Sequence, residues 1–184
     1  MAAQEAAHAS RHARGARVIA DPAARGRALA DFFARLEPRL WRDVAESGAL
    51  HGADPAGARR EWEVFALYAC VRGLVAAGGF GGDSADAVDA LHAAVVERWA
   101  AEPEPPEPLA ERCARVSERY AEFGRIGQEQ EARGPEAVLV ALGAAAARHV
   151  SGTDIADAEL GRMLGELHDA IAQGAAESAR QGEP

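Results

Sequence analysis

Two arginine and histidine pairs are the residues whose types and spacing are best suited to chemistry. Arg72 lies near the end of a strongly apolar stretch and His92 in the helical pattern that follows, and Arg148 and His168 repeat this order later in the chain. A guanidinium removed from water can hold a carboxylate or phosphate through two parallel hydrogen bonds, and a histidine titrates near neutrality. The four residues are therefore candidate ligands of a small anionic molecule. The competing interpretation is that each histidine only packs on a helix face.

An internal duplication would account for the likeness of the two pairs. Residues 91–95 (LHAAV) are similar to residues 167–171 (LHDAI), and the same separation of 76 residues relates Arg72 to Arg148. Other matching segments need different separations, and short matches arise easily in a chain so rich in alanine. Two pseudo-repeated three-helix units are therefore one alternative, and a single bundle without a repeat is the other.

The usual motifs of metal, nucleotide and catalytic sites are missing from the sequence. A pair of Glu-x-x-His motifs, a His-Glu-x-x-His motif and a nucleophile elbow are all absent. The glycine run 78–82 follows an apolar segment and lacks the lysine of a phosphate-binding loop. Cys70 and Cys113 lie far apart and outside any C-x-x-C motif. We expect no metal, no cofactor and no catalytic residue, and the sequence favours a protein that is not an enzyme.

Composition restricts the partners and the location of the chain. The net charge is -9, every one of the 20 basic residues is arginine, and asparagine is absent. The acidic balance opposes nucleic-acid binding, because most of the surface would repel the phosphate backbone. The arginine bias is typical of bacteria with GC-rich genomes. No apolar run is long enough to cross a bilayer, and the N-terminus has no hydrophobic signal core. We therefore expect a cytoplasmic protein with no membrane contact.

Two segments are candidates for binding a partner protein. Residues 1–20 carry Arg11, Arg14 and Arg17 against a single acid, Glu5. This basic arm is either a solvated tail, a docking arm for an acidic partner or an organelle-type leader. Phe80, in the middle of the glycine run, either folds over the bundle or is offered to a partner.

Helical periodicity and cap residues predict an all-α bundle of about six helices. Asp21-Pro22 and Asp54-Pro55 are typical helix starts, and Pro38 either kinks the first helix or divides it. We expect Asp83 and Ser84 to cap the third helix, and the fourth helix to fray over residues 127–134.

Proline marks the best internal boundary of the chain, the segment 102–108 (EPEPPEP), which we expect to be an extended crossing. The predicted organisation is a basic arm at residues 1–20, a single domain at residues 21–177 and a polar tail at residues 178–184. The domain has two possible halves, residues 21–101 and 109–177.

The function predicted first is a non-enzymatic interaction or regulatory protein that acts through a protein partner, with a homodimer as a further option. The alternative is a helical protein that binds a small anionic or apolar ligand or cofactor in a pocket between helices, with or without catalysis. Convergence of Arg72, His92, Arg148 and His168 around one cavity would favour the alternative.

Overall fold

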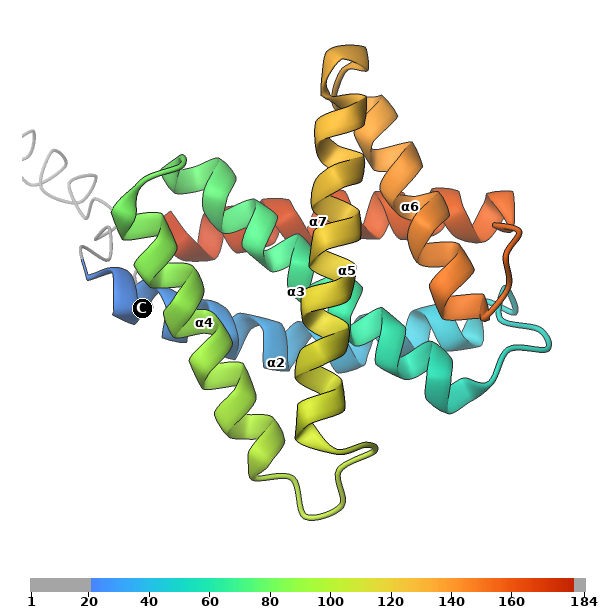
Figure 1. Ribbon diagram of the computed structural model, residues 1–184, viewed down its shortest axis with the longest axis horizontal. Coiled ribbons are helices and arrows are strands. Elements are labelled where there is room, and N and C mark those ends of the chain that lie inside the picture. Colours follow the sequence, from blue (N-terminus) through green and yellow to red (C-terminus); the bar gives the residue numbers. More distant parts are fainter. Residues whose placement is uncertain (1–20, 181–184) are drawn as a thin grey trace, which may run out of the picture.

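The computed structural model describes residues 21–180 and confirms an all-α helical bundle (Figure 1). Within those residues it contains six α-helices, the short 3-10 helix η1 and no strand. The helices are α2 (Pro22–Glu46), α3 (Pro55–Gly78), α4 (Gly82–Ala100), α5 (Leu109–Gln130), η1 (Glu131–Arg133), α6 (Pro135–Ser151) and α7 (Ala158–Arg180). None of the helices in this part of the chain is long and apolar enough to cross a membrane.

The two Asp-Pro helix starts are confirmed. The Asp21 carboxylate accepts the backbone N–H of Ala23 at 3.0 Å, and the Asp54 carboxylate accepts that of Gly57 at 2.8 Å. Each aspartate therefore replaces a hydrogen bond that the first helical turn cannot make for itself. Helix α2 continues through Pro38 as one helix, so this proline does not divide it.

Two predictions about helix ends are wrong. Gly81 is the N-cap of α4, without a side-chain cap, which leaves Asp83 inside the first turn and Ser84 buried. Helix α5 does not fray where expected but continues to Gln130, because Phe123 and Ile126 on its last turns are buried against the core. Helix α7 also extends beyond residue 177, to Arg180.

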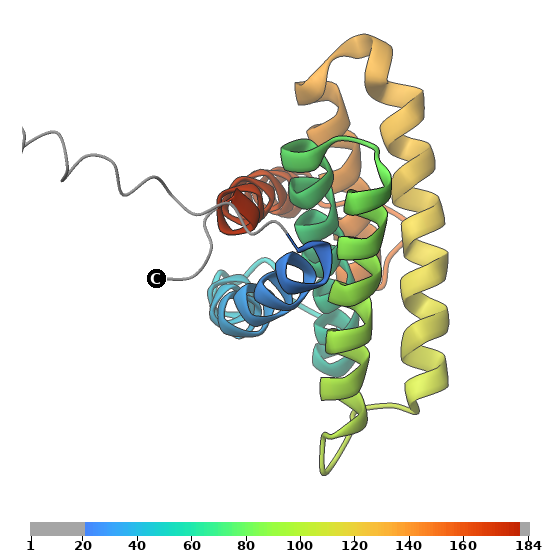
Figure 2. The same cartoon turned by 90° about the vertical axis from the view of Figure 1, so that its left-hand side faces the viewer.

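The helices form three layers, with α3 in the middle (Figure 2). Helix α5 lies on one side, while α2 and α7 lie side by side on the other. The middle helix is apolar on nearly every side, and its residues Trp62, Phe65 and Leu74 are fully buried. This burial is what an all-round apolar helix predicts.

Glycines allow α7 to lie close to its neighbours. A Cβ atom on Gly73 of α3 would lie 2.2 Å from the carbonyl oxygen of Ala172, and one on Gly143 of α6 would lie 2.1 Å from that of Gly161. Only a residue without a side chain fits at these distances. The glycines thus fix the position of α7 against both α3 and α6.

The packing does not follow a pseudo-twofold repeat. Such a repeat would match α2 with α5, α3 with α6 and α4 with α7. Helix α2 packs along α4, but α5 makes no contact with α7 in the described part of the chain. Likewise α3 packs on α7, whereas α6 and α4 do not meet there. The single bundle is therefore the arrangement found, and the matching segments do not occupy equivalent places.

Candidate functional site

The four candidate ligand residues do not converge on one cavity, but two of them do meet. Arg72 of α3 and His168 of α7 line the same pocket, although the sequence places them in different pairs. His92 lines a second pocket beside Tyr120, and Arg148 lines a third at the end of α6. The four residues therefore lie in three different pockets.

The pocket shared by Arg72 and His168, here called the Arg72 pocket, has a volume of about 340 Å³. It lies along the outer side of α7, where α3 and α6 contribute the other wall. Apolar side chains form much of the wall, and polar ones stand at the mouth. The apolar members are Ala76, Leu139, Ala172 and Ala176; the charged and polar members other than Arg72 and His168 are Asp169, Gln173, Glu177 and Arg180.

His168 is a buried polar side chain without a partner. Its exposure is 1 %, and neither ring nitrogen has a hydrogen-bond partner among the described residues. Its ring lies 5.4 Å from that of Phe65 and 6.0 Å from that of Tyr68. Burial, with a further contribution from the positive charge of Arg72, lowers the pKa of His168 to about 3. The imidazole is therefore neutral near pH 7.

Arg72 is half-buried, and no ion pair within residues 21–180 includes it. It acts on the neighbouring Tyr68 through its charge and through a side-chain hydrogen bond: burial raises the pKa of Tyr68, and these two interactions with Arg72 oppose that rise. On the other side, Arg72 Nη1 would lie 3.9 Å from a Cβ atom added at Gly127 of α5. The guanidinium thus ends between three helices with donors to spare.

His92 has a structural explanation. Its Nε2 lies 3.1 Å from the hydroxyl of Tyr120 on α5, and burial lowers the pKa of His92 while Asp89 opposes this change. The adjoining pocket is about 280 Å³ and mostly apolar, with Trp99 and Cys113 in its wall. This contact joins α4 to α5.

Arg148 is also accounted for by packing at a helix end. Its Nη2 lies 4.0 Å from Oε1 of Glu122, whose Oε2 lies 2.7 Å from Nε2 of His149. Arg148 stands in the last turn of α6, where a positive charge also interacts favourably with the helix dipole.

An ion network that sequence reasoning missed joins α3, the proline segment and α5. Arg112 donates to Glu63 from Nε at 3.0 Å and to Glu102 from Nη1 at 3.0 Å, and its guanidinium lies 4.1 Å from the centre of the Trp99 ring. Arg119 donates from Nε to Glu61 at 2.8 Å. The spacing of Arg112, Arg115 and Arg119 places them on one helix face, and this was the available signal. We name these groups and Glu107 the α3–α5 ion network.

A second feature missed from the sequence is an apolar groove of about 590 Å³ between α6 and α7. Val140, which is 64 % exposed, lines it, and Ile155, which is 83 % exposed, precedes its wall residue Ala156. Gly161 and Gly165 also line it, and a Cβ atom on Gly165 would lie 2.9 Å from the carbonyl oxygen of Leu139, so these glycines let α7 pack closely on α6. The charged residues of the groove are mostly acidic: Glu136, Asp157, Glu166 and Asp169 against Arg162. The small residues spaced by four along α7 were the available signal.

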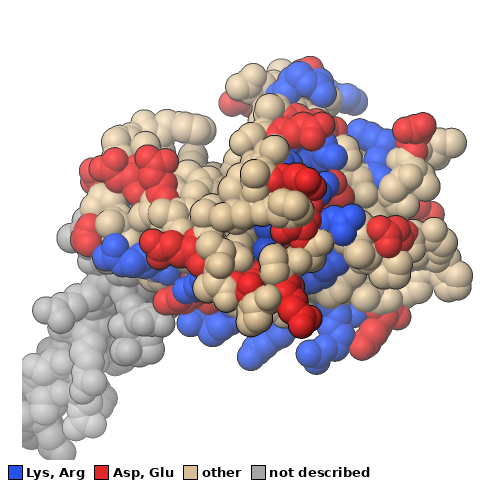
Figure 3. All heavy atoms as spheres, turned by 60° about the horizontal axis from the view of Figure 1, so that its bottom comes forward, with Lys and Arg blue, Asp and Glu red and all other residues tan. Residues whose placement is uncertain are grey.

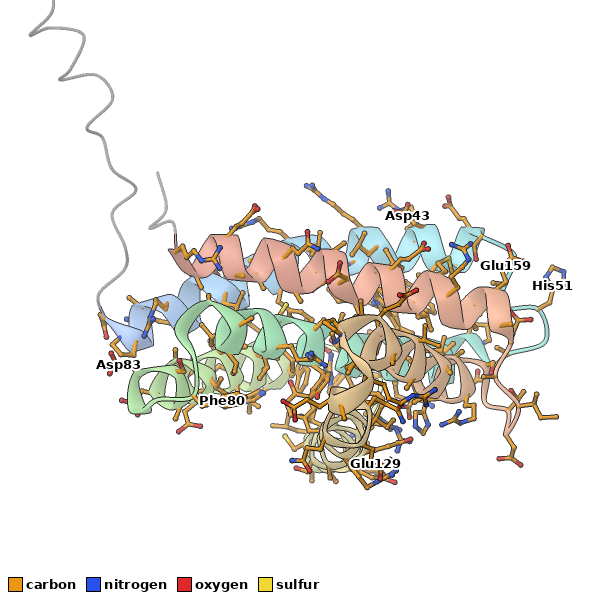
Figure 4. The ribbon with its side chains drawn as sticks, turned by 90° about the horizontal axis from the view of Figure 1, so that it is seen from above. Asp43, His51, Phe80, Asp83, Glu129 and Glu159 are labelled. Atoms are coloured by element: carbon orange, nitrogen blue, oxygen red, sulfur yellow. The ribbon has the colours of Figure 1, made fainter. Side chains whose placement is uncertain are left out.

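The remaining partner candidates lie elsewhere. Arg11, Arg14 and Arg17 lie outside the described residues. Phe80 is 99 % exposed in the turn between α3 and α4, at the opposite end of the molecule from Glu159 at the start of α7 (Figure 4). Figure 3 shows acidic and basic side chains interspersed on the face seen from below.

Metal and disulfide chemistry find no support in the described part of the chain. No group of three or more His, Cys, Asp or Glu side chains in it could hold a metal ion. Cys70 and Cys113 are free thiols, and burial raises the pKa of Cys70.

Comparison with known proteins gives no match to a family model, to a curated protein or to a solved structure.

Proposed function

We propose that this chain is a non-enzymatic interaction protein that associates with a second copy of itself, through the α6–α7 groove of one copy and the basic segment 1–20 of the other. The supporting observation is the groove, because it combines exposed apolar side chains with an acidic rim. Val140 lines it, and the exposed Ile155 directly precedes its wall residue Ala156. Exposed apolar residues gathered at a groove are typical of interaction surfaces.

Charge complementarity selects the occupant. Residues 1–20 contain three arginines and one glutamate, so they carry a net charge of +2. The whole chain carries -9, so residues 21–184 carry -11. The segment is otherwise rich in alanine. Small apolar side chains suit the apolar wall of the groove, which includes Leu139, Val140 and Ala144, and the arginines of the arm suit the carboxylates of the rim.

The groove of a second copy is a better match than the groove of the same molecule. Arg25, near the start of α2, donates to the backbone carbonyl of Asp83 at 3.3 Å. Asp83 and Glu159 lie toward opposite ends of the molecule (Figure 4), so the described chain begins at the end away from the start of the groove.

Sedimentation velocity on the full chain tests the proposal. We expect association that weakens as salt is raised, because screening reduces the attraction between exposed charges. Val140→Arg places a positive charge in the groove, and the triple change Arg11→Gln, Arg14→Gln, Arg17→Gln removes the charge of the arm. Each variant alone should be monomeric.

Mixing the two variants makes the test specific. The Val140→Arg copy keeps its arm and the triple variant keeps its groove, so an equimolar mixture should recover association through a single contact. Phe80→Arg makes the same charge change at the other exposed apolar site and should associate like the wild type. A wild-type chain that is monomeric at low salt, a mixture that stays monomeric, or loss of association only in Phe80→Arg would each overturn the proposal.

A further inference from the structure

The Arg72 pocket contains one buried polar side chain without a partner, His168, and an arginine that pairs with no carboxylate of the described residues. Within the described residues, Arg72 belongs to no ion pair and both nitrogens of His168 lack a hydrogen-bond partner. A buried polar group left without a partner destabilises the fold, so native proteins rarely retain one without a reason. Both groups line one cavity of about 340 Å³, which is large enough for a small organic molecule.

The two groups are complementary to a single chemical group. The Arg72 guanidinium presents parallel N–H donors that match the two oxygens of a carboxylate. The neutral imidazole of His168 carries one N–H that can donate to the same oxyanion. A carboxylate between them would give His168 a hydrogen-bond partner and Arg72 a counter-charge.

The rest of the pocket limits the charge and size of the ligand. Asp169 and Glu177 offset the charges of Arg72 and Arg180, so the pocket is close to neutral overall. The two acids would repel a doubly charged phosphate more strongly than a singly charged carboxylate. The alanine and leucine side chains of the wall favour a short apolar body.

We propose that the Arg72 pocket is a binding site for a small monocarboxylate with a short aliphatic chain, held by the guanidinium of Arg72 and the ring N–H of His168. Both ring nitrogens of His168 are buried in the structure without a ligand. Binding therefore requires the ring to turn so that one N–H faces the pocket. The site adjoins the association surface proposed above, because Leu139 and Asp169 line both, but Val140 lines only the groove, so Val140→Arg should retain the site.

Titration of the full chain with sodium butyrate, followed by NMR of the His168 imidazole, tests the site. We expect a saturable shift of the His168 signals with butyrate, and none with butyramide, which has the same shape without the charge. Inorganic phosphate should bind more weakly than butyrate. Equal shifts with butyramide, or tighter binding of phosphate, would overturn the assignment to a monocarboxylate.

Variants locate the site. Arg72→Gln should weaken butyrate binding at least about tenfold, since it removes a charged hydrogen-bonding partner. Arg148→Gln is the matched control, a half-buried arginine in another cleft, and should bind like the wild type. Arg72→Lys keeps the charge and loses the fork, so it should bind with intermediate affinity even if the glutamine variant folds poorly. Unchanged binding in both Arg72 variants would overturn the proposal.

Discussion

Helix α3 carries charged side chains on both sides of its apolar middle, and the two ends differ in how those charges are treated. Toward its start, Glu61 and Glu63 each meet an arginine of α5. Toward its end, Arg72 meets no carboxylate within the described residues and lies beside His168, whose nitrogens are also unpaired. The paired charges have a structural role, because they connect helices to one another. Polar groups without partners weaken the fold and therefore suggest a role outside it.

The paired end holds the proline segment and α5 in place. Arg112 is 5 % exposed and is shared between Glu63 of α3 and Glu102 of the segment 102–108. Burial on its own would lower the pKa of Arg112, but the two carboxylates raise it. The network fixes the position of α5. Its net contribution to stability is small, because the cost of removing the charges from water offsets most of their attraction.

Breaking the paired end should give the largest effect. Arg112→Met leaves Glu63 in a buried site without its cation and also removes the contact with the Trp99 ring. The free energy of unfolding, measured in urea, should fall by about 3–5 kcal/mol. Arg125→Met, which removes an exposed pair with Glu129, should leave the free energy of unfolding almost unchanged. A similarly small loss of unfolding free energy in both variants would mean that water reaches the charges of the α3–α5 ion network.

At the unpaired end of α3, next to Arg72, the helix approaches α7 at Gly73. Gly73→Ala brings a methyl group against the carbonyl oxygen of Ala172, at 2.2 Å before any movement, so the helices must separate. We expect unfolding to become easier by about 1–3 kcal/mol. Ala172 lines the Arg72 pocket, so butyrate binding should weaken as well.

A matched glycine gives the opposite sign. A Cβ atom on Gly124 of α5 would meet nothing within 4 Å. Gly124→Ala should therefore stabilise the protein by up to about 1 kcal/mol through helix propensity alone, without changing butyrate binding. Thermal unfolding of the two alanine variants, side by side, measures the difference. Equal effects would show that α3 and α7 are not in close contact at Gly73.

The helices could be predicted from sequence because their signals are local. Asp21 and Asp54 are capping residues followed by proline, and the apolar stripes follow the period of a helix. The N-cap of α4 was missed because Gly81 caps through its backbone, and a glycine run gives no information about which member does so. The continuation of α5 was missed because burial of Ile126 depends on helices far away in the sequence.

The candidate site was predicted in its members but not in its grouping. Arg72 and His168 were both identified, each paired with a different residue, because the pairing was taken from a presumed repeat. What brings them together is the packing of α7 on α3, a contact between segments almost a hundred residues apart, and no local pattern reports it. The α3–α5 ion network likewise depends on a contact between helices far apart in the sequence, and the arginine spacing of α5 does not report its partners.

The unpaired end of α3 can be tested by its dependence on pH. His168 has a pKa of about 3 in the fold, against 6.5 ordinarily, so between these values the unfolded chain binds a proton that the fold excludes. Stability is therefore complete above pH 6.5 and is lost as the pH falls. The loss due to His168 should be about 1.4 kcal/mol for each pH unit.

Comparing the wild type with His168→Leu isolates this contribution. The two proteins differ only at residue 168, so the difference between their unfolding free energies should change with pH at the slope given above. Urea unfolding at pH 7, 6 and 5 measures it. Parallel curves would mean that the ring is already solvated or paired in the fold, and the contrast between the two ends of α3 would disappear. A slope that flattens when butyrate is added would mean instead that the bound carboxylate stabilises a protonated ring, so that His168 excludes the proton only while its nitrogens have no partner.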